Sequence, residues 1–159
     1  MAITIDYLAN HPQHCQQVVD WVWENWDRHL DYKYEETRDE FFSSAVTDKL
    51  PLTCIALDDD KPIGMVALLE QDYLDRPDLG PWISDMFIEP AYRNQGIAAR
   101  LFDKIYSVAQ KLGYNKVYLW TENPERYIVR PQYKLIEKAE AKGTPIYIYE
   151  LNFERPFEE

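Results

Sequence analysis

The turn at residues 93–96, Arg-Asn-Gln-Gly, is the stretch whose residue types most clearly favour binding of an anion. It precedes a long amphipathic segment, and Gly96 is one of only five glycines in the chain. The first turn of a helix has N–H groups without intrahelical partners, and the helix dipole adds partial positive charge there. A glycine lets a pyrophosphate approach these donors closely, and Arg93 can add a charge-assisted contact. We therefore expect an anion-binding helix N-terminus, with an ordinary turn as the alternative.

The turn differs from two common nucleotide-binding motifs. No Gly-Lys-Ser/Thr follows it, and the three-glycine pattern of dinucleotide-binding folds is missing. The apolar residues that follow predict a helix of about 16 residues with one apolar face. That face consists of Ile97, Leu101, Ile105, Val108 and Leu112. Gly113 suits a C-terminal cap of this helix.

Short apolar runs bounded by turn residues predict seven strands. They cover residues 3–8, 52–58, 62–70, 82–89, 116–121, 133–140 and 145–153. Two helices are expected after the first strand. One opens at Pro12 and continues to Trp26, and the other opens with a capping box of Thr37 and Glu40. The apolar face of the second helix would contain Phe41, Phe42, Ala45 and Val46.

The order of these elements, with a further short helix at 124–131, predicts one α/β domain over residues 1–159. We expect a mixed, mostly antiparallel sheet of about six to seven strands, flanked by about four helices.

Composition narrows the function classes. The chain is 46% hydrophobic and 14% aromatic, which is typical of a folded protein, and its net charge is −11. This acidity disfavours nucleic acid or an anionic membrane as partner; it either serves solubility alone or favours cationic substrates such as amines. Cys15 and Cys54 are expected to be buried hydrophobes, and no residue spacing predicts a metal site. Without a signal peptide or a long apolar run, we expect a cytoplasmic protein.

Residues 85–105, DMFIEPAYRNQGIAARLFDKI, resemble the acyl-CoA-binding segment of the GNAT superfamily of N-acetyltransferases. Arg93, Gly96 and Ala98 fill its Arg/Gln-x-x-Gly-x-Gly/Ala motif, and the resemblance extends over residues 3–153, including the order of elements. It implies a sheet splayed at the fourth strand, with acetyl-CoA in the cleft and no metal. The residues that it implies for the cofactor are Phe87 and Ile88 (pantetheine arm), Arg93, Asn94, Gln95, Gly96, Ile97 and Ala98 (pyrophosphate), and Asn123.

One part of the family pattern is altered. Many members carry a tyrosine, about five residues before a Gly-aromatic pair, that protonates the departing sulfur. Here Gln132 and Tyr133 occupy the pair, Ile128 falls at the tyrosine position, and Tyr127 precedes it. Tyr127 either replaces the usual acid or packs against the core or the cofactor. A general acid contributes typically about 10²–10⁴-fold, so its loss would slow the reaction without preventing it.

The amine needs a base more than the thiol needs an acid. A primary amine of pKa about 10.4 is free base in only about one part in 10³ at pH 7. Within the architecture that the resemblance implies, Asp85 and Glu70 lie near the cleft mouth, and Glu122 is a third choice. Asp85 lies among apolar residues, on the same face as Ile83 and Phe87 if the alternation of the strand is regular, where its pKa would be raised.

The acceptor cleft in this superfamily is walled by the first two helices and by the loop between the third and fourth strands. In this sequence those segments mix aromatic residues with acids that can bind an ammonium group. They are Trp21, Trp23, Trp26, Tyr32, Tyr34, Tyr73 and Trp82, with Glu24, Asp27, Asp31, Asp72 and Asp75.

The function expected from the resemblance is transfer of an acetyl group from acetyl-CoA to a primary amine by direct attack in a ternary complex. The acceptor would be a small-molecule or peptide amine. The alternative is an acyl-CoA-binding sensor or regulatory module with little activity, which the altered tyrosine position motivates. Dimers are common in the superfamily, and the aromatic C-terminal strand offers a surface for a homodimer.

Overall fold

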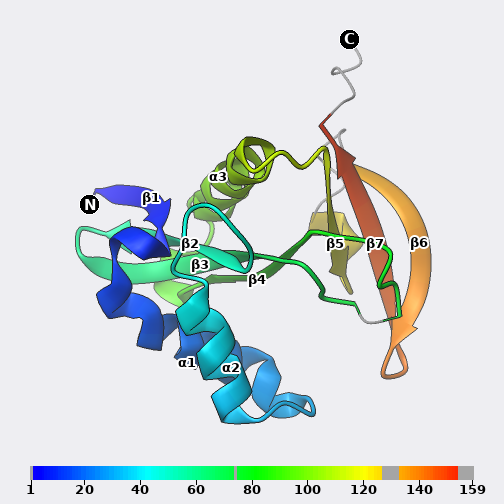
Figure 1. Cartoon of the computed structure of the whole chain (residues 1–159), viewed down its shortest axis with the longest axis horizontal. Coiled ribbons are helices and arrows are strands. Elements are labelled where there is room, and N and C mark those ends of the chain that lie inside the picture. The colour runs from blue at the N-terminus through cyan, green and yellow to red at the C-terminus, as the bar shows by residue number, and fades with distance from the viewer. Residues whose placement is uncertain (1, 74, 127–132, 154–159) are drawn as a thin grey trace.

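The protein forms one open seven-stranded sheet with helices on both faces (Figure 1). The computed structural model describes residues 2–73, 75–126 and 133–153. The strand order is β1-β2-β3-β4-β5-β7-β6, and only the β4–β5 pair is parallel. The strands are β1 (Ile3–Tyr7), β2 (Leu52–Asp58), β3 (Lys61–Leu69), β4 (Trp82–Ile88), β5 (Lys116–Thr121), β6 (Tyr133–Ala141) and β7 (Thr144–Asn152). The α-helices are α1 (Cys15–Asn25), α2 (Tyr34–Ser43) and α3 (Ile97–Lys111).

The prediction of a mixed, mostly antiparallel sheet is confirmed. Within the described ranges three α-helices flank it rather than about four, and residues 124–126 form only a 3-10 turn. The remainder of the short helix expected at 124–131 lies outside the described residues from 127 onward.

Two hydrophobic cores hold the helices to the sheet. The side chains of β2 and β3 alternate between the faces, as strand geometry requires. Leu52, Cys54 and Ala56 pack in the core that includes α3, whereas Ile55 and Leu57 pack in the core that includes α1 and α2. Both strands are therefore buried on both faces, which explains their nearly continuous apolar sequences. Cys15 and Cys54 are free and buried, as predicted.

The sheet divides into two halves between β4 and β5. These strands share a single registered pair, Trp82 with Tyr118, where the Tyr118 N–H donates to the Pro81 carbonyl at 2.9 Å. Beyond Trp82 the strands diverge, and Figure 1 shows β5, β6 and β7 running steeply across the direction of β1–β4. We call β1–β4 the first half-sheet and β5–β7 the second half-sheet. Their divergence opens the sheet at the place that the resemblance implied.

The start of α2 differs from the prediction. The helix begins at Tyr34, and the Lys33 N–H donates to the Glu36 carboxylate at 2.8 Å, so the capping interaction lies before Thr37. Thr37 is a buried residue inside the helix and donates to Asp27 instead. Phe42 is exposed, and Ala45 and Val46 follow the helix end, so the predicted apolar face is correct only for Phe41.

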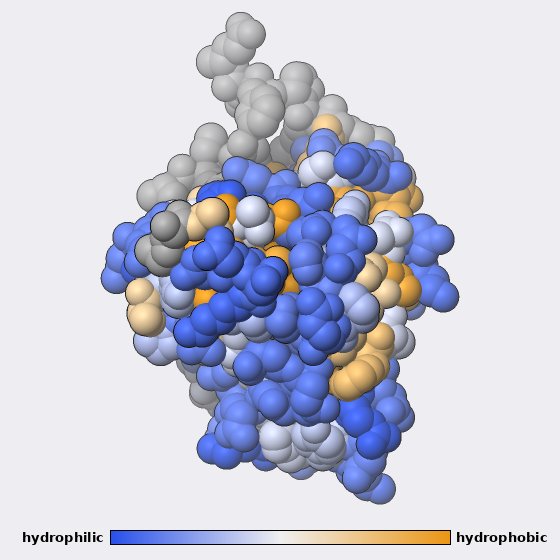
Figure 2. Space-filling model, turned by 90° about the vertical axis from the view of Figure 1, so that its left-hand side faces the viewer, coloured by the Kyte–Doolittle hydropathy of each residue, from blue (hydrophilic) through white to orange (hydrophobic). Residues whose placement is uncertain are grey.

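The outer surface is consistent with the acidic composition. Figure 2, which views the molecule from the side of β1, shows a face covered mainly by hydrophilic side chains with small apolar areas. Within the part of the chain that the structure describes, no helix is long and apolar enough to cross a membrane.

Candidate active site

A cleft of about 760 Å³ lies where the two half-sheets diverge. One wall comes from the end of α1, the segment after it, and α2; the opposite walls come from β4, β5 and the β3–β4 connection (residues 70–81). The polar residues that line it include Asp27, Glu40, Asp72, Ser84, Asp85, Glu122 and Asn123. Its aromatic lining consists of Trp26, Tyr32, Phe41, Phe102 and Trp120.

Asp85 reaches this cleft because β4 contains a bulge. The register between β3 and β4 shifts, so that Met65 pairs with Phe87 while Ala67 pairs with Ser84. Asp85 takes a left-handed backbone conformation there, with φ of 57°. The bulge also breaks the alternation of the strand, since Ile83 packs in the α3 core but Phe87 packs in the α1–α2 core. The expectation that Ile83, Asp85 and Phe87 share one face is therefore wrong.

The pKa of Asp85 is raised well above its ordinary value, as predicted. Burial is the main cause, and repulsion from the Asp72 carboxylate is the next. Burial likewise raises the pKa of Asp72, and the Trp120 indole N–H beside it opposes this rise. That N–H is buried and lies outside ordinary hydrogen-bond geometry. The two carboxylates thus form a pair in which the first proton is held more tightly than in a solvated aspartate.

The opposite wall adds two more acids. Asp27 accepts a hydrogen bond from the Thr37 hydroxyl at 2.6 Å, and burial still raises its pKa. The pKa of Glu40 is raised by burial and by repulsion from Asp27. The cleft therefore gathers four acidic groups from both of its walls, and each of them holds its proton more tightly than a solvated carboxyl group does.

The two other candidate bases differ in their position relative to the cleft. Glu70 is exposed at the end of β3 and is not among the residues that line the cleft. Glu122 lines the cleft at the end of β5. Tyr127 lies outside the described residues, as do Ile128 and Gln132.

The predicted anion-binding turn lies at the N-terminus of α3. Gly96 is the N-cap residue with φ of 79°, a conformation that favours glycine, and Asn94 has φ of 63°. No side chain caps the helix, and its first turn contains no acidic residue. A Cβ built on Gly96 would meet no atom within 4 Å. The turn thus presents helix N–H groups to open space, which fits the approach of a phosphate group.

Arg93 connects this turn to the end of β4. Its Nε donates to the Ile88 carbonyl at 2.9 Å, and its guanidinium lies 5.7 Å from the centre of the Phe87 ring. The Glu89 N–H donates to Ile63 on β3 at 2.9 Å. In a strand, the N–H and C=O of one residue point to one edge, and those of the next residue point to the opposite edge. Because the Glu89 N–H points to β3, the N–H and C=O of Ile88 point away from β3. They therefore face the edge at which β5 has diverged.

The remaining cofactor predictions divide between exposed and buried positions. Gln95 is exposed, with its side-chain amide 3.4 Å from the Ala91 carbonyl. Ile97 is buried in the core and Ala98 is half-buried, so only their backbone can meet a ligand at the helix start. Asn123 lines the cleft, and its N–H donates to the Thr121 hydroxyl at 2.9 Å.

Four of the twelve residues predicted for the acceptor walls line the cleft. They are Trp26, Asp27, Tyr32 and Asp72. Others are committed elsewhere: Trp82 is fully buried in the core, and Trp21 is buried and donates to Glu89. Glu40 also lines the cleft, although its position in the sequence predicted a place in a capping box. In a helix that begins at Tyr34, Glu40 immediately precedes the buried Phe41 and therefore lies at the border of the buried face.

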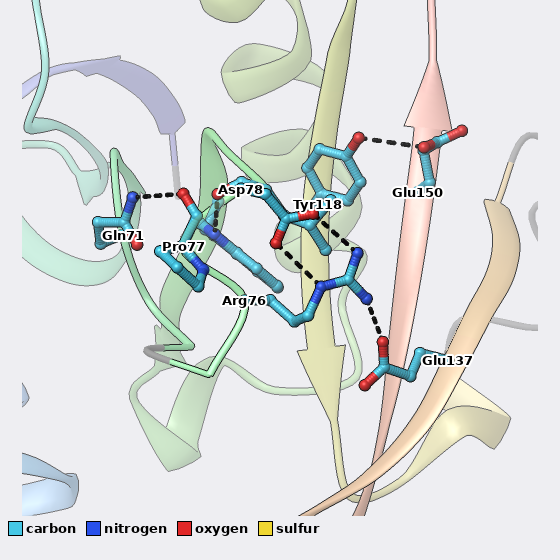
Figure 3. A network of polar contacts seen from close by, with 9 residues as sticks. Gln71, Arg76, Pro77, Asp78, Tyr118, Glu137 and Glu150 are labelled. Carbon is cyan, nitrogen blue, oxygen red and sulfur yellow. Dashed lines mark hydrogen bonds and ion pairs between the residues drawn. The ribbon is translucent and has the colours of Figure 1, made fainter.

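The β3–β4 connection, which carries Asp72, is tied to the second half-sheet (Figure 3). Arg76 donates through Nε and Nη2 to both carboxylate oxygens of Asp78, at 3.0 Å each, and through Nη1 to Glu137 on β6. The Tyr73 hydroxyl donates to the Glu140 carbonyl at 3.3 Å. The contacts to Glu137 and Glu140 span the gap between the half-sheets, whereas the Arg76–Asp78 pair lies within the connection itself.

Comparison with known proteins agrees with this geometry. The model of the Acetyltransferase (GNAT) family matches residues 15–143, and the chain belongs to this family. It is therefore an acyltransferase, an acetyl-CoA-dependent N-acetyltransferase. No curated protein matches the sequence.

Solved structures share the fold at low sequence identity. An aminoglycoside 6'-N-acetyltransferase complexed with coenzyme A is 16% identical with a TM-score of 0.69, over 100% of both chains. An acetyltransferase from Streptococcus agalactiae 2603 is 23% identical with a TM-score of 0.64, over 94% of this chain and 98% of the other. Mutant forms of a spermidine/spermine N-acetyltransferase from Vibrio cholerae are 16% identical with a TM-score of 0.67, over 96% of both chains.

Proposed function

We propose that this protein transfers the acetyl group of acetyl-CoA directly to a primary amine, with Asp85 as the general base. The observation that carries the proposal is the β4 bulge, which aims a carboxylate of raised pKa into the cleft between the half-sheets. A base whose pKa lies closer to neutral accepts the proton of an amine more readily than an ordinary aspartate does.

The residues around α3 fit the cofactor. The uncapped helix start from Gln95 to Ala98, with Gly96 open to solvent, would bind the pyrophosphate, and Asn94 and Arg93 would flank it. The backbone of Phe87 and Ile88 would pair with the pantetheine arm like an additional strand, because the edge of β4 toward β5 is open there. Asn123, on the opposite side of the divergence, would contact the same ligand. Acetyl-CoA supplies the acetyl group as an activated thioester.

The chain's own residues then act on the acceptor. As the amine nitrogen bonds to the acetyl carbon, its proton passes to the Asp85 carboxylate, and the carbon–sulfur bond breaks. The Ile88 N–H, which faces away from β3, would donate to the acetyl oxygen as negative charge develops on it. A thiol of pKa about 8.5 leaves tolerably as thiolate, and the assignment of Tyr127 as its proton donor stays a prediction.

Thiol release from acetyl-CoA at pH about 8, measured across a panel of amines with a no-amine blank, tests this function at a pH where more amine is free base than at pH 7. We expect release that depends on one class of amine. Tight acetyl-CoA binding without release for any amine or peptide would instead support the alternative of an acyl-CoA-binding sensor.

A further inference from the structure

We propose that the acceptor is a di- or polyamine, whose reacting nitrogen lies at Asp85 while a second ammonium group binds between Asp27 and Glu40. This inference rests on the proposed function, because it takes the reacting end from the role of Asp85. It adds that the wall formed by α2 and the segment after α1 selects the substrate by a second charge.

The four carboxylates form two pairs on separate walls of the cleft. Asp72 and Asp85 come from the β3–β4 connection and from β4, whereas Asp27 and Glu40 come from the segment after α1 and from α2. Each of the four has a raised pKa, and repulsion from at least one of the others contributes for Asp72, Asp85 and Glu40. A single ammonium at Asp85 would leave the opposite pair uncompensated.

The chain does not supply the missing positive charge within the part that the structure describes. No lysine or arginine is among the residues that line the cleft, where His29 is the only basic side chain. The ion pairs of the described residues involve other acids, namely Asp6, Glu24, Asp39, Asp78 and Glu137. A cation from outside is therefore the natural partner of this cleft.

Tyr32 adds an aromatic face to the acids of this cleft. Its side chain is 46% exposed and lines the cleft, and the pKa of its hydroxyl is raised by partial burial and then by repulsion from all four carboxylates. Trp26 borders the same wall. Aromatic faces combined with carboxylates are the surroundings in which alkylammonium groups bind, and a cleft of about 760 Å³ has room for an extended diamine.

The test compares α,ω-diaminoalkanes of three to eight carbons with n-alkylamines of equal length, at saturating acetyl-CoA. We expect the best diamine to exceed its matched monoamine by about tenfold in kcat/KM, beyond the factor of two from its two equivalent ends. Glu40→Gln should reduce this ratio about three- to tenfold, since it removes one charge from the second pair. Glu40 lines the cleft and belongs to neither hydrophobic core, so this substitution leaves the core intact.

Glu35→Gln is the matched control, because Glu35 is an exposed acid on the same helix outside the cleft. It should leave the ratio unchanged. Equal rates for diamines and monoamines, or a diamine-to-monoamine ratio that Glu40→Gln does not alter, would overturn the proposed site for a second ammonium group. The proposed acetyl transfer would remain unaffected by either result. Absence of release with every amine, despite normal acetyl-CoA binding, would overturn the proposed function and this inference together.

Discussion

The two ends of the proposed active site are built in different ways. At the cofactor end, the proposed pyrophosphate site is a single contiguous turn, Arg93 to Ala98, whose backbone conformation is set by Gly96 and the start of α3. The proposed acceptor end lies in the cleft and is assembled from four separate segments, which contribute Asp27, Glu40, Asp72 and Asp85. A motif of adjacent residues can recognise a ligand that a whole family shares. Residues from distant segments can be substituted one at a time, so the ligand that they recognise can differ between family members. We infer that binding of the shared cofactor is set locally and that acceptor choice is set by tertiary structure.

Loss of Asp85 should have the largest effect and should act at the acceptor end alone. We expect Asp85→Asn to lower kcat by about 10²–10⁴-fold and to leave the KM for acetyl-CoA nearly unchanged, because a base acts in the chemical step. In the unmodified enzyme kcat/KM should rise with pH through the raised pKa of the Asp72–Asp85 pair, since the base acts when deprotonated. Steady-state kinetics from pH 5 to 9 would check both points.

The substitution Glu70→Gln tests whether Glu70, rather than Asp85, is the general base. Glu70 is exposed and outside the cleft lining, so we expect most of the activity to remain. A loss equal to that of Asp85→Asn would move the base to Glu70 and would contradict our assignment of the acceptor end.

Gly96→Glu should break the cofactor end alone. A carboxylate at the start of α3 would repel a pyrophosphate and remove the open approach, so we expect the Kd for acetyl-CoA to rise about 100-fold, or about 2.7 kcal/mol. Gly143→Glu is the matched control: Gly143 has φ of 81° and nothing within 4 Å, but it lies in the β6–β7 turn. Calorimetric titration with acetyl-CoA would compare the two, and equal affinities would remove the turn from the binding site.

Arg76→Met should weaken the acceptor end by a smaller amount. It removes the contact to Glu137 that holds the β3–β4 connection, and with it Asp72, against the second half-sheet, together with the pair to Asp78 within the connection. We expect the KM for the amine to rise about threefold, whereas the free energy of unfolding should fall only slightly, because solvent screens exposed ion pairs. Arg38→Met removes an exposed pair within α2 and should change neither quantity measurably. An unchanged amine KM in Arg76→Met would show that the connection holds its position without this bridge.

The smallest expected effect is a gain of stability in Asp85→Asn. Burial and repulsion favour the neutral form of Asp85 in the folded protein, so between its ordinary and its raised pKa the folded state binds more protons than the unfolded chain. The free energy of unfolding therefore falls as the pH rises through this window. Asparagine does not ionise, so the Asp85→Asn variant keeps the stability that the unmodified protein loses. We expect a higher Tm at pH 8, by roughly 2–4 °C for each kcal/mol gained, and a difference that shrinks toward zero near pH 3, below the ordinary pKa of an aspartate. Thermal unfolding at both pH values would measure it, and a lower Tm at pH 8 would indicate a supporting role for this carboxylate instead.

Most strands, the long helix and the proposed anion-binding turn can be read from the sequence alone. The seven strands and the long helix followed from apolar periodicity, because a strand buried on both faces and an amphipathic helix each require a recognisable pattern. The start of α3 followed from Gly96, because a left-handed N-cap conformation favours glycine. These features depend on neighbours in the chain, which the sequence displays directly.

The way in which the acids come together depends on contacts between distant segments of the chain. The bulge that turns Asp85 into the cleft arises from the pairing of β4 with β3, and regular alternation predicted a different face. Likewise Thr37 looked like a helix cap but donates to Asp27, and α2 begins earlier, at Tyr34. Glu40 consequently reaches the cleft beside Asp27. Contacts between segments far apart in the chain set these positions, because burial and pairing outweigh the small local preferences for a cap or a regular strand.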